Sequence, residues 1–205
     1  MLKHLIGLYE PIKGDILIKG KSIVKATEAE KSSLCREFGV LYQSGALFSS
    51  LTLQENVAVP LKEFTNLSET MIESIAKLKL SLVGLKGYEN FLPSEISGGM
   101  KKRAGLARAL ALDPEILFFD EPSAGLDPIS SAELDKLILE LRDTLGCTMI
   151  IVTHELDSIF SIADNAIVLD KKEKGIIESG NPRKLRKKSK NEWVREFLNR
   201  SNMRG

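Results

Sequence analysis

Two short, fully apolar runs with a helical pattern between them dominate the middle of the chain. Residues 116–119 and 149–152 are continuous hydrophobic stretches, which is typical of strands buried on both faces of a sheet. Between them, large aliphatic residues recur at helical spacing: Leu134, Leu137, Ile138, Leu141 and Leu145. Strand, helix and strand in this order predict a parallel βαβ unit and an α/β fold. We expect the helix to begin with a capping box of Ser130 and Glu133 and to end before Gly146.

The part of the chain before this unit is predicted to be mostly helical. Residues 38–42 predict one more short strand, and residues 69–83 predict a helix that ends at Gly84. We therefore place a helical insertion, a small subdomain, at about residues 52–95.

The part after this unit carries two weaker patterns. The apolar runs 166–170 and 175–178 predict a hairpin at a sheet edge. Residues 182–205 form a basic and then amphipathic tail. Six of the eight residues 183–190 are Lys or Arg, which could suit nucleic acid or anionic lipid, but we expect a solvated basic turn. The apolar residues that follow are expected to pack on a subunit: Trp193, Val194, Phe197 and Leu198.

Composition narrows the function classes. Of 205 residues, 43% are hydrophobic and 28% charged, and the formal net charge is +1, which is ordinary for a globular domain and excludes a generally basic nucleic-acid binder. No apolar run approaches the roughly 18 residues of a membrane span. The two cysteines, Cys35 and Cys147, form no metal or disulfide pattern, so we expect a reduced, cytosolic protein.

Four residues with reactive or polar side chains follow predicted strands. Asp120 and Glu121 end the first apolar run, His154 follows the second, and Gln43 follows residues 38–42. The carboxyl ends of parallel strands are where ligands bind. Asp120 could hold Mg²⁺ and Glu121 could deprotonate a water, as nucleoside-triphosphate hydrolysis requires, while His154 could contact a phosphate. The alternative for each is an ordinary loop residue in solvent.

A serine and two glycines precede a predicted helix at residues 97–99. Backbone N–H groups at such a helix start are open to a phosphate, with the helix dipole behind them. The alternative for Ser97, Gly98 and Gly99 is a plain N-cap, with the Lys and Arg residues that follow merely solvated.

Taken together, these motifs resemble the nucleotide-binding subunit of an ABC transporter over essentially the whole chain. Gln43 is similar to the Q-loop glutamine, Ser97-Gly98-Gly99 to the signature motif, and residues 116–120 to a Walker B strand. By the same resemblance Glu121 is the catalytic base, Asp127 the D-loop aspartate and His154 the switch histidine. The resemblance implies a P-loop NTPase-like fold with a C-terminal edge hairpin, and ATP hydrolysis. Its cofactors would be ATP and Mg²⁺, the metal held by Asp120 and Gln43 partly through water.

Shorter stretches of the sequence resemble one subgroup of this family. Four features resemble the ATPase of MCE-type lipid transporters: residues 43–48, residues 55–61, the methionine after Gly99 and residues 125–130. This group of transporters includes the maintenance-of-lipid-asymmetry system. That resemblance implies a homodimer, an integral-membrane permease and an MCE-domain protein as partners, and no nucleic acid. It also implies a place on the inner face of the cell membrane and transport of phospholipid or another hydrophobic substrate across the bacterial envelope.

The phosphate loop G-x-x-x-x-G-K-[ST] of this family does not occur in the sequence. Gly20-Lys21-Ser22 is out of register, because position 15 is Asp. The resemblance implies that Met1 falls just after this Walker A loop, so that the loop and a central strand are missing and the parallel sheet is incomplete. We therefore expect little ATP binding or hydrolysis by this chain alone.

Three alternatives stay open. The chain could be a remnant or regulatory module that does not hydrolyse ATP but binds a membrane partner around Gln43 and the helical insertion. It could serve another ABC importer. A soluble ABC protein is a further alternative, although such a protein usually has two cassettes or a long coiled coil.

Overall fold

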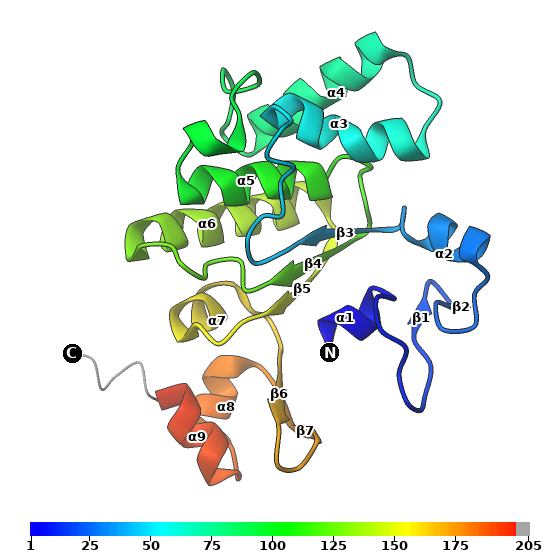
Figure 1. The fold of residues 1–205 in the computed structure, drawn as a ribbon. Helices are drawn as coiled ribbons and strands as arrows, with labels where there is room; N and C mark the ends of the chain where they lie inside the picture. The colour runs from blue at the N-terminus through cyan, green and yellow to red at the C-terminus, as the bar shows by residue number, and fades with distance from the viewer. Residues whose placement is uncertain (200–205) are drawn as a thin grey trace.

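A three-stranded parallel sheet forms the centre of the fold in the computed structural model, which describes residues 1–199 (Figure 1). Strands β3 (Phe38–Leu41), β4 (Ile116–Asp120) and β5 (Thr148–Val152) lie in that order, with Phe38 opposite Ile116 and Asp120 opposite Val152. Helix α6 (Pro128–Leu145) connects β4 to β5. The predicted βαβ unit and the predicted third strand are thus confirmed.

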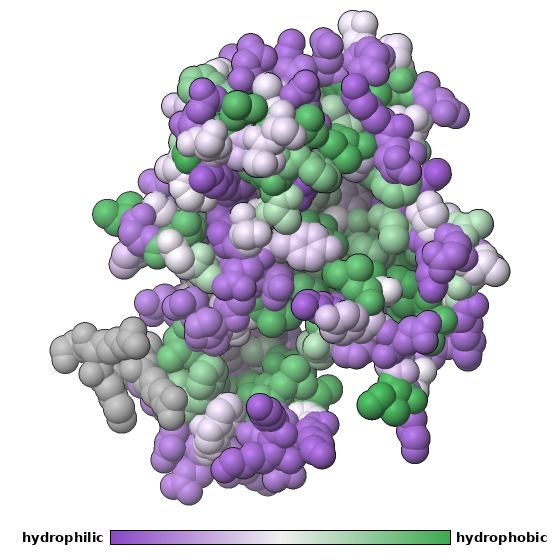
Figure 2. Space-filling view, in the orientation of Figure 1, coloured by the Kyte–Doolittle hydropathy of each residue, from purple (hydrophilic) through white to green (hydrophobic). Residues whose placement is uncertain are grey.

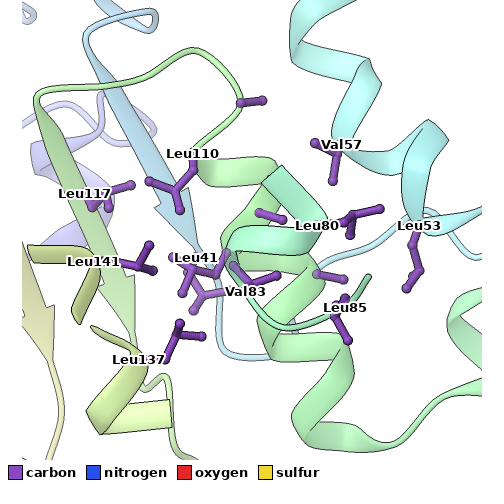
Figure 3. Packing of buried hydrophobic residues seen from close by; sticks show 14 of the residues in the cluster. Leu41, Leu53, Val57, Leu80, Val83, Leu85, Leu110, Leu117, Leu137 and Leu141 are labelled. Atoms are coloured by element: carbon purple, nitrogen blue, oxygen red, sulfur yellow. The ribbon is translucent and has the colours of Figure 1, made fainter. Parts of the chain in front are cut away.

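The helices of the middle segment cover one face of this sheet. Helix α5 (Gly98–Ala109) packs on β3, and α3 (Leu53–Phe64) and α4 (Glu69–Leu82) pack on α5. In Figure 1, α3 and α4 lie beyond α5, away from the strands. A short 3₁₀ turn, η1 (Pro93–Glu95), leads into α5. Figure 3 shows buried aliphatic side chains from β3, β4, α4, α5 and α6 meeting here, among them Leu41, Leu80, Leu110, Leu117 and Leu141.

The N-terminal segment covers the opposite face. It contains α1 (Leu2–Leu5), a small hairpin of β1 (Leu17–Ile18) and β2 (Lys21–Ser22), and α2 (Glu28–Leu34). Its buried residues pack against Phe38 and Phe118, whose rings meet edge to face 5.5 Å apart. Because Leu117 and Phe119 face the other core, β4 is buried on both faces, as its continuous apolar run predicts.

The C-terminal segment differs from its prediction in two places. After α7 (Leu156–Ile162), strands β6 (Ala166–Asp170) and β7 (Gly175–Gly180) form an antiparallel sheet of their own, so the predicted hairpin exists but not at the edge of the parallel sheet. The predicted basic turn is helix α8 (Pro182–Lys188), because Asn181 caps it and Pro182 occupies its first position.

The last helix packs within the chain. In α9 (Glu192–Asn199), Val194 and Leu198 are buried against Leu185 of α8 rather than left for a partner, whereas Trp193 is exposed and stacks on Phe197. Residues 200–205 of the predicted tail lie outside the described residues.

The predicted start of α6 is wrong. Asp127, not Ser130, is its N-cap: the Asp127 carboxylate accepts hydrogen bonds from the backbone N–H groups of Ile129 and Ser130, both at 3.0 Å. Pro128, whose φ is preset for a helix, takes the first position. Gly146 ends the helix with a φ of 64°, as predicted.

Polar side chains cover most of the surface, and apolar ones gather near the middle of the face drawn in Figure 2. Among residues 1–199, no helix is both long and apolar enough to cross a membrane.

Candidate active site

Three neighbouring strands bring the polar residues of the motifs to one edge of the sheet. Asp120 ends β4 opposite Val152 of β5, and Glu121 follows it directly. His154 lies just beyond β5, and Gln43 just beyond β3. The Gln43 and His154 side chains are exposed, whereas Asp120 is half-buried. The parallel register thus places at one edge the groups that the sequence predicts there.

Glu121 sits in a strained backbone conformation. Its φ is 47°, in the left-handed region that residues with a Cβ seldom adopt, and its N–H donates to the Val152 carbonyl at 2.8 Å. This bend turns the chain sharply at the end of β4, directly after Asp120. Such strain is tolerated where the surrounding structure imposes it, and here the β5 carbonyl helps to fix it.

One oxygen of the Glu121 carboxylate is paired and the other is not. The Nδ1–H of His154 donates to Oε1 at 2.8 Å. Among the described residues, Oε2 is buried and has no hydrogen-bond partner. Because an unpaired buried carboxylate oxygen is costly, this atom marks a place for a donor such as a water molecule.

His154 responds to this contact. The hydrogen bond that His154 donates to Glu121, together with the negative charge of that carboxylate, raises the pKa of His154 above the ordinary value of 6.5. The side chain itself is 70% exposed. With a proton on Nδ1, His154 donates to Glu121 whether the ring is neutral or charged.

A lysine that the sequence analysis expects to be solvated is instead buried next to these residues. Lys102 of α5 is 5% exposed, and its ammonium donates to the backbone carbonyl of Gln43 and, at 3.3 Å, to that of Glu121. A signal was present in the sequence, since Lys102 shares a helical stripe with Gly105, Leu106 and Ala109.

Ser97, Gly98 and Gly99 form a second group at the start of α5. The Ser97 hydroxyl caps the helix by accepting from the Met100 N–H at 3.2 Å. Ser97 and Gly98 are exposed, so the first N–H groups of this 12-residue helix face outward. Ser97 can therefore cap the helix while the first N–H groups of α5 remain open to a phosphate.

Asp127 belongs to this second group. A Cβ on Gly98 would lie 3.8 Å from Leu126, and one on Gly99 would lie 3.8 Å from Ser130, so the start of α6 adjoins the start of α5. The hydrogen bonds from Ser130 and Ile129 lower the pKa of Asp127, which keeps its carboxylate charged. Within residues 1–199, no side-chain hydrogen bond joins this group directly to the sheet-edge residues. Lys102 of α5 does bond to two of those residues, Gln43 and Glu121.

The sheet-edge residues include groups that could hold a magnesium ion. Asp120 supplies a half-buried carboxylate, Gln43 an exposed amide, and Glu121 the buried unpaired oxygen. No cluster of three or more His, Cys, Asp or Glu ligands occurs within residues 1–199. Mg²⁺ usually takes one or two carboxylates and completes its shell with water and phosphate oxygens, so Asp120 and Gln43 are the residues that could hold it.

Comparison with known proteins identifies the family. The model of the ABC transporter family matches residues 1–124. The chain belongs to the ABC transporter family. This ABC transporter chain is 46% identical over 198 residues to the probable ribonucleotide transport ATP-binding protein mkl of Mycobacterium leprae, covering 97% of this chain and 56% of that protein. It therefore spans about half the length of its mycobacterial relatives.

The lipid subgroup predicted from the sequence is also represented. The intermembrane phospholipid transport system ATP-binding protein MlaF of Escherichia coli K12 is 41% identical over 199 residues, which cover 97% of this ABC transporter chain and 72% of that protein. MlaF of Haemophilus influenzae is 43% identical over 169 residues, or 82% of this chain and 64% of that protein. The predicted resemblance is thus confirmed.

Solved structures confirm the predicted ABC ATPase fold. The ATP-binding cassette MJ0796, in a dimeric post-hydrolysis state bound to ADP and Pi, matches with a TM-score of 0.78 and 26% identity, covering 88% of this chain and 78% of that one. The protein cbiO1 from Clostridium perfringens, part of the ABC transporter complex cbiONQ, matches with a TM-score of 0.80 and 29% identity, covering 99% and 78%.

Proposed function

We propose that this chain is the ATP-hydrolysing part of an ABC transporter that moves phospholipid or a similar hydrophobic substrate across the bacterial envelope. The observation that carries the proposal is the pairing of a buried, unsatisfied Glu121 oxygen with Asp120 beside it and His154 on the other oxygen. The MlaF relatives, which are named for phospholipid transport, support the substrate class.

In this mechanism Glu121 is the general base. Its Oε2 accepts the proton of the attacking water, while His154 holds Oε1 and so fixes the carboxylate. Mg²⁺, held by Asp120 and the Gln43 amide partly through water, would neutralise charge on the ATP phosphates.

Ser97, Gly98 and Gly99 are proposed to complete the phosphate site of a second copy. Their exposure at the start of α5, away from the sheet-edge group, suits a contact across a homodimer, with Asp127 beside them. The dimeric, ADP-bound relative supports this arrangement.

A groove beside β3 is proposed to receive the membrane permease. It has a volume of about 570 Å³ and lies between β3, α3 and α5, with Tyr42, Phe48, Phe64 and Arg108 among its lining residues. Its mixture of aromatic rings and one cation suits a short amphipathic segment. We propose that the permease holds the chain on the inner face of the membrane and that an MCE-domain protein completes the assembly.

Two alternative functions stay open for this chain. The groove would also serve a regulatory module that binds the permease without turnover. The likeness to cbiO1, which is part of an ABC transporter complex, supports the alternative that the chain serves another ABC transporter. The 205 residues contain no G-x-x-x-x-G-K-[ST] loop, so we propose that the triphosphate cradle lies outside them and that they bind ATP only weakly by themselves.

Three preparations test the proposal: residues 1–205 alone, the same chain mixed with an intact related subunit, and the chain extended by its upstream reading frame. We expect negligible ATP affinity in the first, partial turnover in the second, and ATP binding and hydrolysis in the third. Coupling to substrate is measured as ATP-dependent phospholipid transfer between vesicles in the presence of the permease. An extended chain that binds ATP without turnover would favour the regulatory alternative, and micromolar binding by residues 1–205 would contradict the cradle argument.

A further inference from the structure

Lys102 joins two loops that end neighbouring strands. Its side chain runs inward from α5, and its ammonium donates to the carbonyl of Gln43, after β3, and to the carbonyl of Glu121, after β4. The Glu121 carbonyl accepts a second hydrogen bond, at 3.1 Å, from the Ala124 N–H. One cation therefore holds the backbone of both residues.

Arg108, a second cation of α5, contacts only the loop after β3, residues 43–48. Arg108 donates to the Gly45 carbonyl at 3.0 Å and to the Ala46 carbonyl at 2.8 Å. The loop also lies very close to the helix, since a Cβ on Gly105 would approach the Gly45 oxygen to 2.9 Å. Residues 43–48 are thus attached to α5 at several points, whereas Glu121 is attached to α5 through Lys102.

Burial of a lysine here needs a reason beyond packing. Lys102 as a residue is 5% exposed, and desolvation by burial lowers its pKa. An apolar side chain at this position would avoid that cost. What an apolar side chain cannot do is donate to two carbonyls at once, beside the negative charges of Asp120 and Glu121.

We propose that Lys102 is a positioning residue that fixes the Gln43 loop and the Glu121 turn relative to each other. The inference rests on the proposed function, because it assigns Lys102 to the hydrolytic step. With the link intact, a nucleotide contacted by Gln43 finds Glu121 at a set position. Without it, the strained turn at Glu121 relaxes independently of the Gln43 loop, and nucleotide binds but reacts slowly.

Hydrogen exchange of the nucleotide-free chain tests the link itself. Lys102→Met should accelerate amide exchange in two segments, residues 43–48 and residues 121–126. The matched control is Arg108→Met, which removes the other cation of the same helix. It should accelerate exchange in residues 43–48 only. Unchanged exchange in residues 121–126 of Lys102→Met would overturn the proposal.

Kinetics test the consequence in a preparation that hydrolyses ATP. Lys102→Met should lower kcat by about ten- to a hundred-fold while KM for ATP changes by less than about threefold. Lys102→Arg, which keeps a cation with several donors, should recover most of the loss. A raised KM with unchanged kcat, or no recovery by arginine, would overturn the assignment.

The hydrogen-exchange and kinetic experiments can fail independently of each other. If neither the mixed nor the extended preparation hydrolyses ATP, the proposed function fails, but the exchange measurement still decides whether Lys102 joins the two loops. If Lys102→Met does not fold, Lys102→Gln, whose amide NH₂ is a donor group without the charge, is judged by the same exchange and kinetic criteria.

Discussion

Glu121 and His154 are joined by a 2.8 Å hydrogen bond from Nδ1–H to Oε1, and the buried Oε2 has no hydrogen-bond partner within residues 1–199. The two residues follow adjacent strands, so the register of β4 with β5 sets their separation. His154 is largely exposed, whereas Glu121 is 20% exposed. The arrangement therefore resembles a base held from its solvent side by a histidine.

The first prediction concerns this base. In a preparation that hydrolyses ATP, Glu121→Gln should still bind ATP but lose turnover by about 10² or more, because an amide cannot accept the proton of water. The amide oxygen can still accept from His154, so thermal unfolding should change little. Turnover and ATP affinity are measured on the same sample.

Glu155→Gln is the matched control for this prediction. Glu155 lies 3.8 Å from the other ring nitrogen of His154 and is about half exposed. Its change should leave turnover within about twofold of the unsubstituted protein. Equal losses in the two variants would remove Glu121 from the role of base.

The second prediction concerns the exposed start of α5. Ser97→Arg puts a bulky cation where a phosphate of a second copy is proposed to bind, and should abolish ATP-driven dimer formation. It also removes an N-cap, which costs about 1 kcal/mol. Dimer formation is measured by sedimentation with and without ATP.

Ser68→Arg separates the two effects. Ser68 caps α4 through the Met71 N–H at 3.4 Å, as Ser97 caps α5, but lies far from the signature residues in sequence. It should lose a similar amount of stability and still dimerise with ATP. If Ser97→Arg also dimerises, Ser97 is only a helix cap.

Local patterns predicted the sheet well because they report burial directly. The continuous apolar run of β4 and the helical spacing of α6 reflect contacts that the fold makes. The start of α6 was missed because Ser130 and Glu133 match a capping box, while Asp127 and Pro128 form an equally local signal that the structure uses. Glu133 instead pairs with Arg103 of α5.

Tertiary contacts explain what the sequence could not predict. Lys102 and Lys79 look like surface lysines, yet Lys102 is buried on two carbonyls and Lys79 is buried against Asp113. The positive φ of Glu121 depends on the strand beside it. The roles assigned to Glu121, His154 and Asp127 stay predictions.

The third prediction concerns a buried acid. Asp135 of α6 is 4% exposed, and one of its oxygens has no partner among the described residues. Burial raises the pKa of Asp135, against the smaller opposing effect of Ser158. The folded state then binds the proton more tightly than the unfolded chain, so the free energy of unfolding falls as pH rises from about 4 through the raised pKa.

Asp135→Asn removes this penalty. At pH 7 to 8 the variant should be more stable by about 1 to 2 kcal/mol, and near pH 4 the difference should disappear. Urea unfolding across this pH range measures it. Asp157→Asn, the change of an exposed neighbouring acid, should give a much smaller gain. A gain for Asp135→Asn that does not vary with pH would contradict burial as the cause.

The last prediction concerns the contact that sets α5 against the sheet. A Cβ on Gly39 of β3 would lie 2.0 Å from the Ala109 carbonyl oxygen and 2.9 Å from Leu117, so only glycine allows the helix and strand to approach this closely. Gly39→Ala must push α5 outward, which should lower the free energy of unfolding by about 2 to 3 kcal/mol. The same shift would draw Lys102 away from the Gln43 carbonyl. Gly175→Ala, whose Cβ would meet only Glu173 at 3.7 Å, should cost less than about 1 kcal/mol. Urea unfolding compares the two, and equal stability of the two variants would mean that α5 does not depend on the absence of a side chain at position 39.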